Sequence, residues 1–306
     1  MTRAADFGRV AVLFGGSSAE REISLRSGAA VLAALLRRGV QAEALDPAVE
    51  SGQGLDLSDY DRAFIVLHGR GGEDGQIQGA LDSLGLPYTG SGVLGSALGM
   101  DKYRCKLLWQ GLGLPTPAFA PMRSEDDLAQ AAALGFPLMV KPAHEGSSIG
   151  MGRADDAEQL AAAFRQALEY DRLVLAERWI QGAEYTAAIL GRSALPLIRL
   201  ETPNAFYDYA AKYQADSTQY HCPCGLDAEK EQTLQALALE AFDAVGASGW
   251  GRVDILMDEQ QQPFLIEVNT VPGMTDHSLV PMAAAAASID FDELVWRILE
   301  TSLERD

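Results

Sequence analysis

The sequence predicts an α/β protein whose N-terminal part is a doubly wound parallel sheet. Over the first hundred residues, segments with the apolar content of buried strands alternate with helix-like segments, which is typical of a parallel sheet covered by helices. Near the C-terminus, two short segments alternate apolar and polar residues as paired strands do. At 306 residues, the chain is long enough for about two domains with hydrophobic cores.

The first unit, residues 1–101, contains two buried strands and two helices. Val10 to Phe14 and Ala63 to Leu67 are apolar and predict the strands. Ser24 to Arg38 and Gln76 to Leu84 predict helices, and a glycine follows each of them. Because ligands bind at the carboxyl ends of strands in such sheets, the loops that follow the two strands are candidate sites.

The second unit, residues 102–184, begins near Lys102. Ser124, with Asp127 three residues later, predicts a capping box at the start of a helix that runs through Ala133. Leu138 to Lys141 reads as a strand that Pro142 halts. The remaining expected elements are a Gly/Ser loop at 146–150, a helix from Asp156 to Tyr170 and a strand from Leu173 to Arg178.

The third unit, residues 185–306, begins with strands at Ala187 to Leu190 and Leu195 to Leu200. The aromatic and polar segment 206–220 shows no regular periodicity, and long structureless connections in compact domains are usually lids or disordered. A helix from Asp227 to Val245, a hairpin and two helical runs complete the chain.

The hairpin carries the most informative pattern. If its polar turn is centred between residues 260 and 261, antiparallel pairing places Asp254 opposite Glu267 and Arg252 opposite Asn269, all on one face. Two carboxylates on facing positions, with Cβ atoms about 5 Å apart, repel by about 3 kcal/mol at an effective dielectric of about 20. A cation removes that penalty. Asp254, Glu267 and Asn269 therefore predict an all-oxygen Mg²⁺ site. The alternative is a solvated sheet face with a salt bridge to Arg252.

Composition excludes several classes of partner. The net charge is −19, which argues against nucleic-acid and anionic-membrane binding, because both need a basic surface. No apolar stretch is long enough to span a membrane, and the N-terminus does not resemble a signal peptide. Cys105, Cys222 and Cys224 form no C-x-x-C pair. We expect reduced thiols in a cytoplasmic protein.

A phosphate-bearing ligand would then need local positive groups. Only five of the 24 basic residues are lysines, and a lysine retained where arginine is the default suits phosphate oxygens. By contrast, Lys106 and Lys230 are expected to be ordinary surface lysines. No G-x-x-x-x-G-K-[ST] motif occurs, and we interpret the G-x-G-x-x-G match at residues 90–95 as a turn.

The loop from Glu145 to Met151 is a candidate phosphate cradle. Its small residues let backbone N–H groups approach phosphate oxygens, and Lys141 adds a fixed charge at the end of the preceding strand. Glu177, on the next strand, suits the hydroxyl or amino groups of a nucleotide, and Glu184 is a second candidate. Each of these acids is equally well explained as an ordinary surface residue.

The N-terminal loops offer a different chemistry. Glu20 lies among glycines and serines at a strand-to-helix turn, where a carboxylate suits an ammonium group better than a phosphate. His68 lies in a similar loop and suits a carboxylate contact or proton transfer. A loop histidine without a function is an equally good reading of His68.

Taken in order, these motifs closely resemble the D-alanine-D-alanine ligase family, which has the ATP-grasp fold. The resemblance covers essentially the whole chain, with small departures at Arg178, Cys224 and Val268. The motifs that carry it are residues 15–22, 67–75, 100–102, 206–209, Lys212-Tyr213, 251–254 and 269–275.

The resemblance implies a substrate domain at 1–101, a central ATP-grasp subdomain at 102–184 and a C-terminal ATP-grasp subdomain at 185–306, with a lid at 206–220. It also implies that ATP phosphorylates one D-alanine and that the amine of a second attacks the D-alanyl phosphate, for peptidoglycan precursor synthesis. Expected cofactors are ATP and two Mg²⁺ ions, with Mn²⁺ as the substitute. D-alanine and ATP are the expected small-molecule partners of a cytoplasmic homodimer.

The resemblance further assigns residue roles. Glu20 would take the first ammonium group, with His68 near its carboxylate, and Arg252 with the Gly273 N–H would stabilise the oxyanion. Ser147 and Tyr213 would join Glu20 in a link between domains. The implied nucleotide contacts are Lys102, Lys141, Glu177, Arg178, Glu184 and Lys212; the implied metal ligands are Asp254, Glu267 and Asn269. Ser278 and Leu279 would receive the second carboxylate, and Lys212 would also contact substrate.

Two other functions compete with this one. A depsipeptide ligase that joins D-alanine to D-lactate shares nearly every motif, although Tyr213 argues against it. A non-catalytic nucleotide-binding sensor with the same fold would have little reason to keep Arg252, Asp254, Glu267 and Asn269 together.

Overall fold

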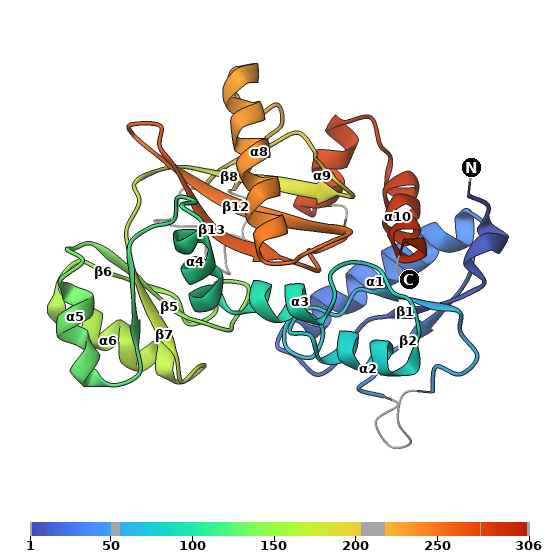
Figure 1. Cartoon of the computed structure of the whole chain (residues 1–306), viewed down its shortest axis with the longest axis horizontal. Helices are drawn as coiled ribbons and strands as arrows, with labels where there is room; N and C mark the ends of the chain where they lie inside the picture. The colour runs from blue at the N-terminus through green and yellow to red at the C-terminus, as the bar shows by residue number, and fades with distance from the viewer. Residues whose placement is uncertain (1, 50–55, 203–217, 276, 305–306) are drawn as a thin grey trace.

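The computed structural model describes residues 2–49, 56–202, 218–275 and 277–304, and Figure 1 shows them arranged around three sheets. In these ranges, no helix is both long and apolar enough to cross a membrane. The three cysteines, all within these ranges, form no disulfide.

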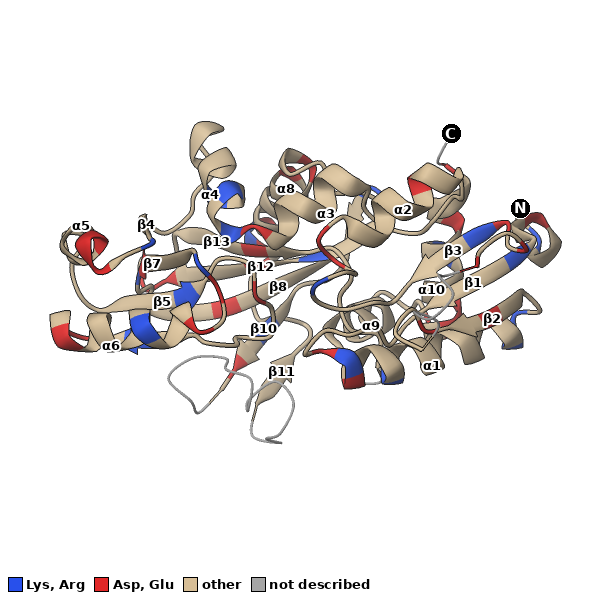
Figure 2. Cartoon of the chain, turned by 90° about the horizontal axis from the view of Figure 1, so that it is seen from below, with Lys and Arg blue, Asp and Glu red and all other residues tan. Residues whose placement is uncertain are grey.

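The N-terminal sheet is parallel, as predicted. Its order is β2-β1-β3, with β1 at Arg9–Leu13, β2 at Gln41–Leu45 and β3 at Arg62–Ile65. The helices of this unit are α1 at Arg21–Arg37, α2 at Gln76–Leu84 and α3 at Val93–Met100. Seen from below, α1 and α2 lie on opposite sides of the sheet (Figure 2). The sequence analysis missed β2, because three of its five residues are exposed and it lacks an apolar run.

The motif at residues 90–95 is only partly a turn. Gly92 precedes α3, so residues 93–95 form the first turn of a helix, contrary to the prediction. The preceding Tyr88 forms only an isolated bridge to Ala63, which agrees with a poor central strand. Gly95 is required by a close approach, because a Cβ there would lie 2.4 Å from the carbonyl oxygen of Gly246.

The central unit is a four-stranded antiparallel sheet of order β4-β7-β5-β6. Ser124 and Asp127 form the predicted capping box. Its strands are β4 at Phe119–Met122, β5 at Leu138–Pro142, β6 at Gly152–Ala154 and β7 at Val174–Arg178; its helices are α5 at Leu128–Ala132 and α6 at Ala157–Leu168. The preceding helix, α4 at Lys102–Gly111, packs through Cys105 and Trp109 into the core of the C-terminal sheet.

The C-terminal sheet is antiparallel, of order β11-β10-β8-β12-β13, with β9 paired to β8. Its strands are β8 at Gly182–Leu190, β9 at Ser193–Ala194, β10 at Ile198–Glu201, β11 at Gln219–His221, β12 at Trp250–Asp258 and β13 at Pro263–Asn269; its helices are α8 at Ala228–Ala244, α9 at Leu279–Ala286 and α10 at Phe291–Glu300. Gln219 and Tyr220, predicted as part of an irregular loop, belong to β11, and residues 206–217 of that predicted loop lie outside the described ranges.

The last helices return to the N-terminal unit. Residues of α9 and α10 share one hydrophobic core with β1 and β3, and Figure 1 shows α10 beside α1. Arg37 and Arg38 at the end of α1 pair with Asp292 and Glu293 of α10. The C-terminal helices α9 and α10 therefore pack with the N-terminal sheet as one unit.

The hairpin has the predicted pairing at the polar patch but not the predicted turn. Arg252 faces Asn269 and Asp254 faces Glu267. The turn is centred one half-residue earlier, since Asp258 N–H donates to the Gln262 carbonyl. A β-bulge restores the register: Ile255 faces Leu265, so Ile266 is the extra residue on β13.

Candidate active site

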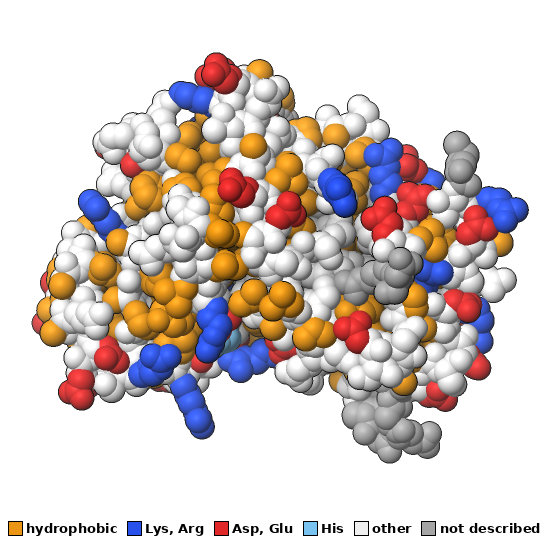
Figure 3. Space-filling view, viewed as in Figure 1, with side chains coloured by type: hydrophobic (Ala, Val, Ile, Leu, Met, Phe, Trp, Pro, Cys, Tyr) orange, Lys and Arg blue, Asp and Glu red, His pale blue; other side chains and the backbone are white. Residues whose placement is uncertain are grey.

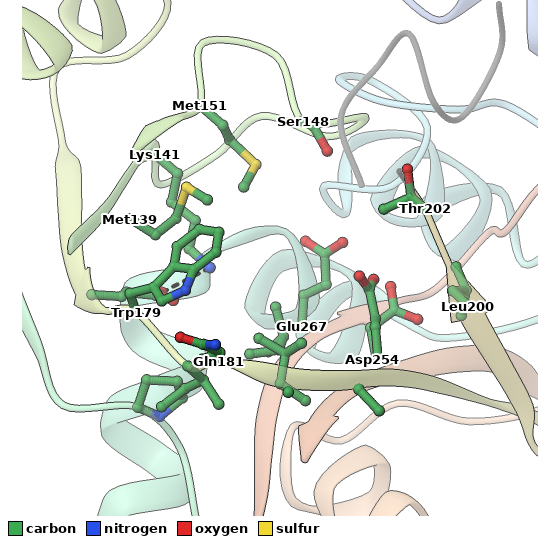
Figure 4. A pocket seen from close by; sticks show the side chains of 18 of the residues that line it. Met139, Lys141, Ser148, Met151, Trp179, Gln181, Leu200, Thr202, Asp254 and Glu267 are labelled. Atoms are coloured by element: carbon green, nitrogen blue, oxygen red, sulfur yellow. Dashed lines mark ion pairs between the residues drawn. The ribbon is translucent and has the colours of Figure 1, made fainter. Parts of the chain in front are cut away.

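A cavity of about 460 Å³ lies between the central and C-terminal sheets. Figure 4 shows Lys141 and Trp179 on one side of it and Asp254, Glu267 and Leu200 on the other. Seven predicted site residues line it: Lys102, Lys141, Glu177, Arg178, Glu184, Asp254 and Glu267.

One part of the cavity is apolar, which sequence reasoning did not predict. Met139, Met151, Trp179, Leu256 and Ile266 line it. The aromatic and sulfur-bearing side chains present flat, polarisable surfaces on which a planar ring can stack. Nothing in the local pattern distinguishes these residues from core positions, because they come from five separate segments of the chain.

Glu177 is the most deeply buried acid of the site. Its Oε1 lies 2.8 Å from Lys141 Nζ and 3.2 Å from Lys106 Nζ. Burial favours the neutral acid, but the two ammonium groups outweigh it and hold the pKa of Glu177 below its ordinary value. Glu177 is therefore an ionised acceptor at the wall of the cavity.

The expectation of a surface position for Lys106 is wrong. Its side chain is fully buried, donates to Thr116 Oγ1 at 2.8 Å and lies 5.9 Å from the Phe119 ring centroid. Burial lowers the pKa of Lys106 to about 8, against the opposing effect of Glu177. The local sequence does not indicate that Lys106 is buried, because its partner Glu177 lies 71 positions away. Lys230 is exposed, as expected.

Lys102 joins the cavity to the hairpin. At the start of α4, its Nζ donates to the Glu145 carbonyl at 2.7 Å and lies 3.3 Å from Glu267 Oε2. Burial opposes the charge, yet Glu267 raises the pKa of Lys102 above its ordinary value. A single ammonium group thus holds the predicted phosphate loop next to the predicted metal ligands.

In the polar patch of the hairpin, the charge of Asp254 is neutralised by Arg252. Arg252 donates from Nε and Nη2 to the two oxygens of Asp254, each at 2.8 Å. Thr186 Oγ1 donates to Asp254 at 2.7 Å, and Asn269 Nδ2 donates at 3.2 Å. The salt bridge of the alternative interpretation is therefore present, but Asp254 is buried rather than solvated.

The oxygen atoms of the same side chains suit a hard divalent cation as ligands. Asp254 and Glu267 face each other across the hairpin, and the amide of Asn269 lies beside Asp254. Within the described ranges, no group of three or more His, Cys, Asp and Glu side chains is placed to hold a metal. A cation here would therefore need the Asn269 oxygen, water or phosphate oxygens to complete its shell, as Mg²⁺ usually does.

Two contacts join the N-terminal loops to the predicted phosphate loop. Ser147 Oγ donates to Glu20 Oε1, and Arg70 Nε donates to Glu145 at 2.8 Å. The fit is close: a Cβ on Gly146 would lie 2.9 Å from Glu20 Oε2. Ser147 and Glu20 therefore meet as the resemblance implies. Lys212 and Tyr213 lie outside the described residues.

A histidine link fixes the base of the same loop. His144 Nδ1 lies 2.7 Å from Asp171 and its Nε2 lies 3.1 Å from Asp101, which caps α4. Hydrogen bonding to Asp101, which outweighs burial, raises the pKa of His144. The same network, aided by Arg104, lowers the pKa of Asp101 to about 2 despite burial. Sequence reasoning did not single out this link.

His68, Gly273 and Ser278 lie around the start of α9. His68 is buried, with Nδ1 2.8 Å from the Val271 carbonyl. Although burial opposes the charge, Glu73 raises the pKa of His68. A Cβ on Gly273 would lie 2.9 Å from Ser278 Oγ.

Ser278 and Leu279 form the N-terminus of α9. The Leu279 side chain is buried, so only its backbone can reach a ligand. Helix N-termini present free N–H groups that favour a carboxylate.

Comparison with known proteins gives one consistent result. Residues 40–91 match the family model described as D-ala D-ala ligase N-terminus, and residues 108–300 match that of the D-ala D-ala ligase C-terminus. Proteins named D-alanine-D-alanine ligase from Alkalilimnicola ehrlichii and Methylococcus capsulatus are 62% and 63% identical over 305 and 301 residues. These alignments cover 99% and 98% of this chain, and 97% of each relative.

Solved structures agree. A D-alanine-D-alanine ligase from Bacillus anthracis superposes with a TM-score of 0.85 at 35% identity, and its complex with ATP superposes with a TM-score of 0.83 at 32% identity; each match covers 97% of both chains. A D-Ala:D-Ser ligase from Enterococcus faecalis has a TM-score of 0.85 at 29% identity, covering 96% of this chain and 99% of that one.

Proposed function

This chain belongs to the D-alanine-D-alanine ligase family, and from that premise we propose how its residues divide the work. The protein is an ATP-dependent ligase that joins two D-alanine molecules for cell-wall synthesis. The observation that carries the residue assignment is the cavity between the two antiparallel sheets, which seven expected site residues line together. We keep 1–101, 102–184 and 185–306 as the proposed domains.

In the nucleotide site, the apolar slot beside Trp179 takes the base and Glu177 accepts from its amino group. Arg178 and Glu184 contact the rest of the adenosine. Lys102 and Lys141 hold the phosphates, because charge neutralisation and positioning are most of what phosphoryl transfer requires. From the segment outside the described residues, Lys212 adds a further contact.

Asp254, Glu267 and Asn269 hold Mg²⁺, or Mn²⁺ in its place, and we propose two ions. Bound there, the cation neutralises phosphate charge and orients the transferred group. Lys102 and Arg252 keep the two carboxylates in place before any cation arrives, since each acid already has one cationic neighbour.

The D-alanine sites lie toward the N-terminal unit. Glu20 takes the ammonium group of the first D-alanine, with His68 near its carboxylate. Arg252, oriented by its two bonds to Asp254, stabilises the oxyanion with the Gly273 N–H, a role for fixed donors in a dry site. Ser278 and the Leu279 N–H receive the second carboxylate, together with Lys212.

Product analysis tests this assignment against its rivals. We expect ADP release with D-alanine alone and D-alanyl-D-alanine as the product. Addition of D-lactate or D-serine tests for the ester or the mixed dipeptide. By the family resemblance Tyr213 favours the amine as nucleophile. If ATP binds but no ADP forms with any of the three acceptors, the protein is a nucleotide sensor instead.

Assembly and location follow from the family resemblance. We propose a homodimer in the cytoplasm, and light scattering tests the oligomeric state. Hydrophobic side chains reach the surface on the face shown in Figure 3. Leu107 of α4 and Leu112 at its C-terminal end are exposed.

A further inference from the structure

Lys106 is a fully buried cation that the proposed chemistry does not use. It does not line the cavity, so it cannot touch a bound nucleotide. Its ammonium group instead lies 3.2 Å from the carboxylate of Glu177, which does line the cavity. Burying an ammonium group is costly unless the group is paired and hydrogen-bonded. The position of Lys106 behind Glu177 therefore calls for an explanation.

The lysine is held in place from the side away from the cavity. Thr116 Oγ1 accepts from Lys106 Nζ at 2.8 Å and donates to the Leu265 carbonyl of β13 at 2.9 Å. The Leu265 N–H in turn donates to the Pro115 carbonyl at 2.8 Å. Lys106 is thus fixed to the hairpin sheet and contacts Glu177 on the central sheet.

Both lysine contacts fall on the same oxygen of Glu177. Lys141 and Lys106 each make their shortest contact with Oε1. With two ammonium groups beside it, the carboxylate stays ionised, and an ionised carboxylate only accepts hydrogen bonds. A purine with an amino group at position 6 donates to such an acceptor. A purine with an oxo group there presents a second acceptor, and the two repel.

We propose that Lys106 is a positioning residue for nucleobase selection: it holds Glu177 as an ionised acceptor, so the site prefers a 6-amino purine to a 6-oxo purine. Lys106 has this role only if Glu177 faces the base, as proposed above. Lys141 lies closer to Glu177, at 2.8 Å, but is also proposed to hold the phosphates, whereas Lys106 does not line the cavity.

The test compares the binding of ATP and inosine triphosphate, which differ at position 6. Quenching of Trp179 fluorescence gives both affinities without turnover. Lys106→Met removes the charge and keeps much of the length. We expect it to weaken ATP binding at least about tenfold, the lower end of the value of one hydrogen bond to a charged group. Inosine triphosphate should bind at least as well as before, because Glu177 can then take a proton and donate to the oxo group.

Further variants separate charge from packing. Lys106→Arg keeps the charge, and we expect it to retain the ATP preference to within about threefold. In a Glu177→Gln background, Lys106→Met should leave the ratio of the two affinities unchanged, because the acceptor it acts on is gone. The exposed Lys230→Met is the matched control and should bind both nucleotides as the wild type does.

If Lys106→Met does not fold, Thr116→Val takes its place, since it removes the hydroxyl that holds the lysine. It should lower the ATP preference about threefold. An unchanged ratio in these variants, while Glu177→Gln alters it, would overturn the role of Lys106. An unchanged ratio in Glu177→Gln itself would instead refute the placement of Glu177 at the base. ADP release by the wild type with D-alanine tests the ligase function separately.

Discussion

Replacing Glu267 by Gln tests whether the facing carboxylates bind a cation. The change removes one negative charge and keeps the shape of the side chain. In the structure, Glu267 Oε2 lies 3.3 Å from Lys102 Nζ and faces Asp254 across the hairpin. Two electrostatic interactions are therefore lost together, one attractive and one repulsive.

The attraction to Lys102 and the repulsion from Asp254 partly cancel. At an effective dielectric of about 20, attraction across 3.3 Å is about 5 kcal/mol, and repulsion across about 5 Å is about 3 kcal/mol. The expected cost is then about 2 kcal/mol. Lys102 keeps its bond to the Glu145 carbonyl. Since domains are stable by about 5 to 15 kcal/mol, the Glu267→Gln variant should remain folded.

Turnover should respond far more strongly than stability. An amide is a weaker ligand than a carboxylate for a hard cation, and we expect ADP release to fall at least about 100-fold. Urea unfolding measures the change in stability, and ADP release across a range of Mg²⁺ concentrations measures the change in turnover. The matched control is Glu259→Gln at the exposed tip of the same hairpin. Unchanged turnover at saturating Mg²⁺ would refute the assignment of Glu267 as a metal ligand.

Three further predictions concern the substrate loop, pH and the core. Glu20→Gln should raise the KM for D-alanine about tenfold while ATP affinity changes less than about twofold, because only an ammonium partner is lost; equal losses would contradict the assignment. The pKa of His144 is raised above 6.5, so its imidazolium stabilises the fold below that pH and the contribution is lost as pH rises through the raised pKa. His144→Gln should accordingly lower the free energy of unfolding in mildly acidic buffer and change it little in alkaline buffer; a pH-independent loss would refute the link to Asp101. Trp109→Phe should lower the free energy of unfolding by about 1 to 3 kcal/mol, because the buried Nε1 donates to the Ala241 carbonyl at 3.1 Å; urea unfolding measures it, and an unchanged midpoint would show that this bond contributes nothing.

Local patterns were sufficient where a feature depends on neighbouring residues. The Ser124 capping box follows from four residues, the facing pair Asp254 and Glu267 from one hairpin, and the parallel N-terminal sheet from the alternation of strand-like and helix-like segments. The pairing of Asp254 with Glu267 was predicted correctly although the predicted turn was half a residue too late, because the extra residue Ile266 compensates for the difference. An alternating pattern of this length does not indicate a bulge.

Features that depend on distant segments were not predictable in this way. Lys106 looks like any surface lysine until Glu177 and Thr116 are brought around it by the packing of two sheets. Trp179 and Met139 become a slot for a ring only when β12 and β13 close the opposite side. The family resemblance supplied roles for residues such as Glu184, which local reasoning had left undecided.

The tip of the hairpin differs from its paired part in tolerance for change. β12 is held by β8 along its whole length, Trp250–Asp258, as well as by β13, so the register of the polar patch is fixed from both edges. Beyond this paired stretch, residues 259–262 are exposed. Peptide epitopes or fluorescent labels could be introduced at this tip without moving the reactive groups. The tip of β12 and β13 is therefore the natural attachment point for reporting on this ligase from outside its active site.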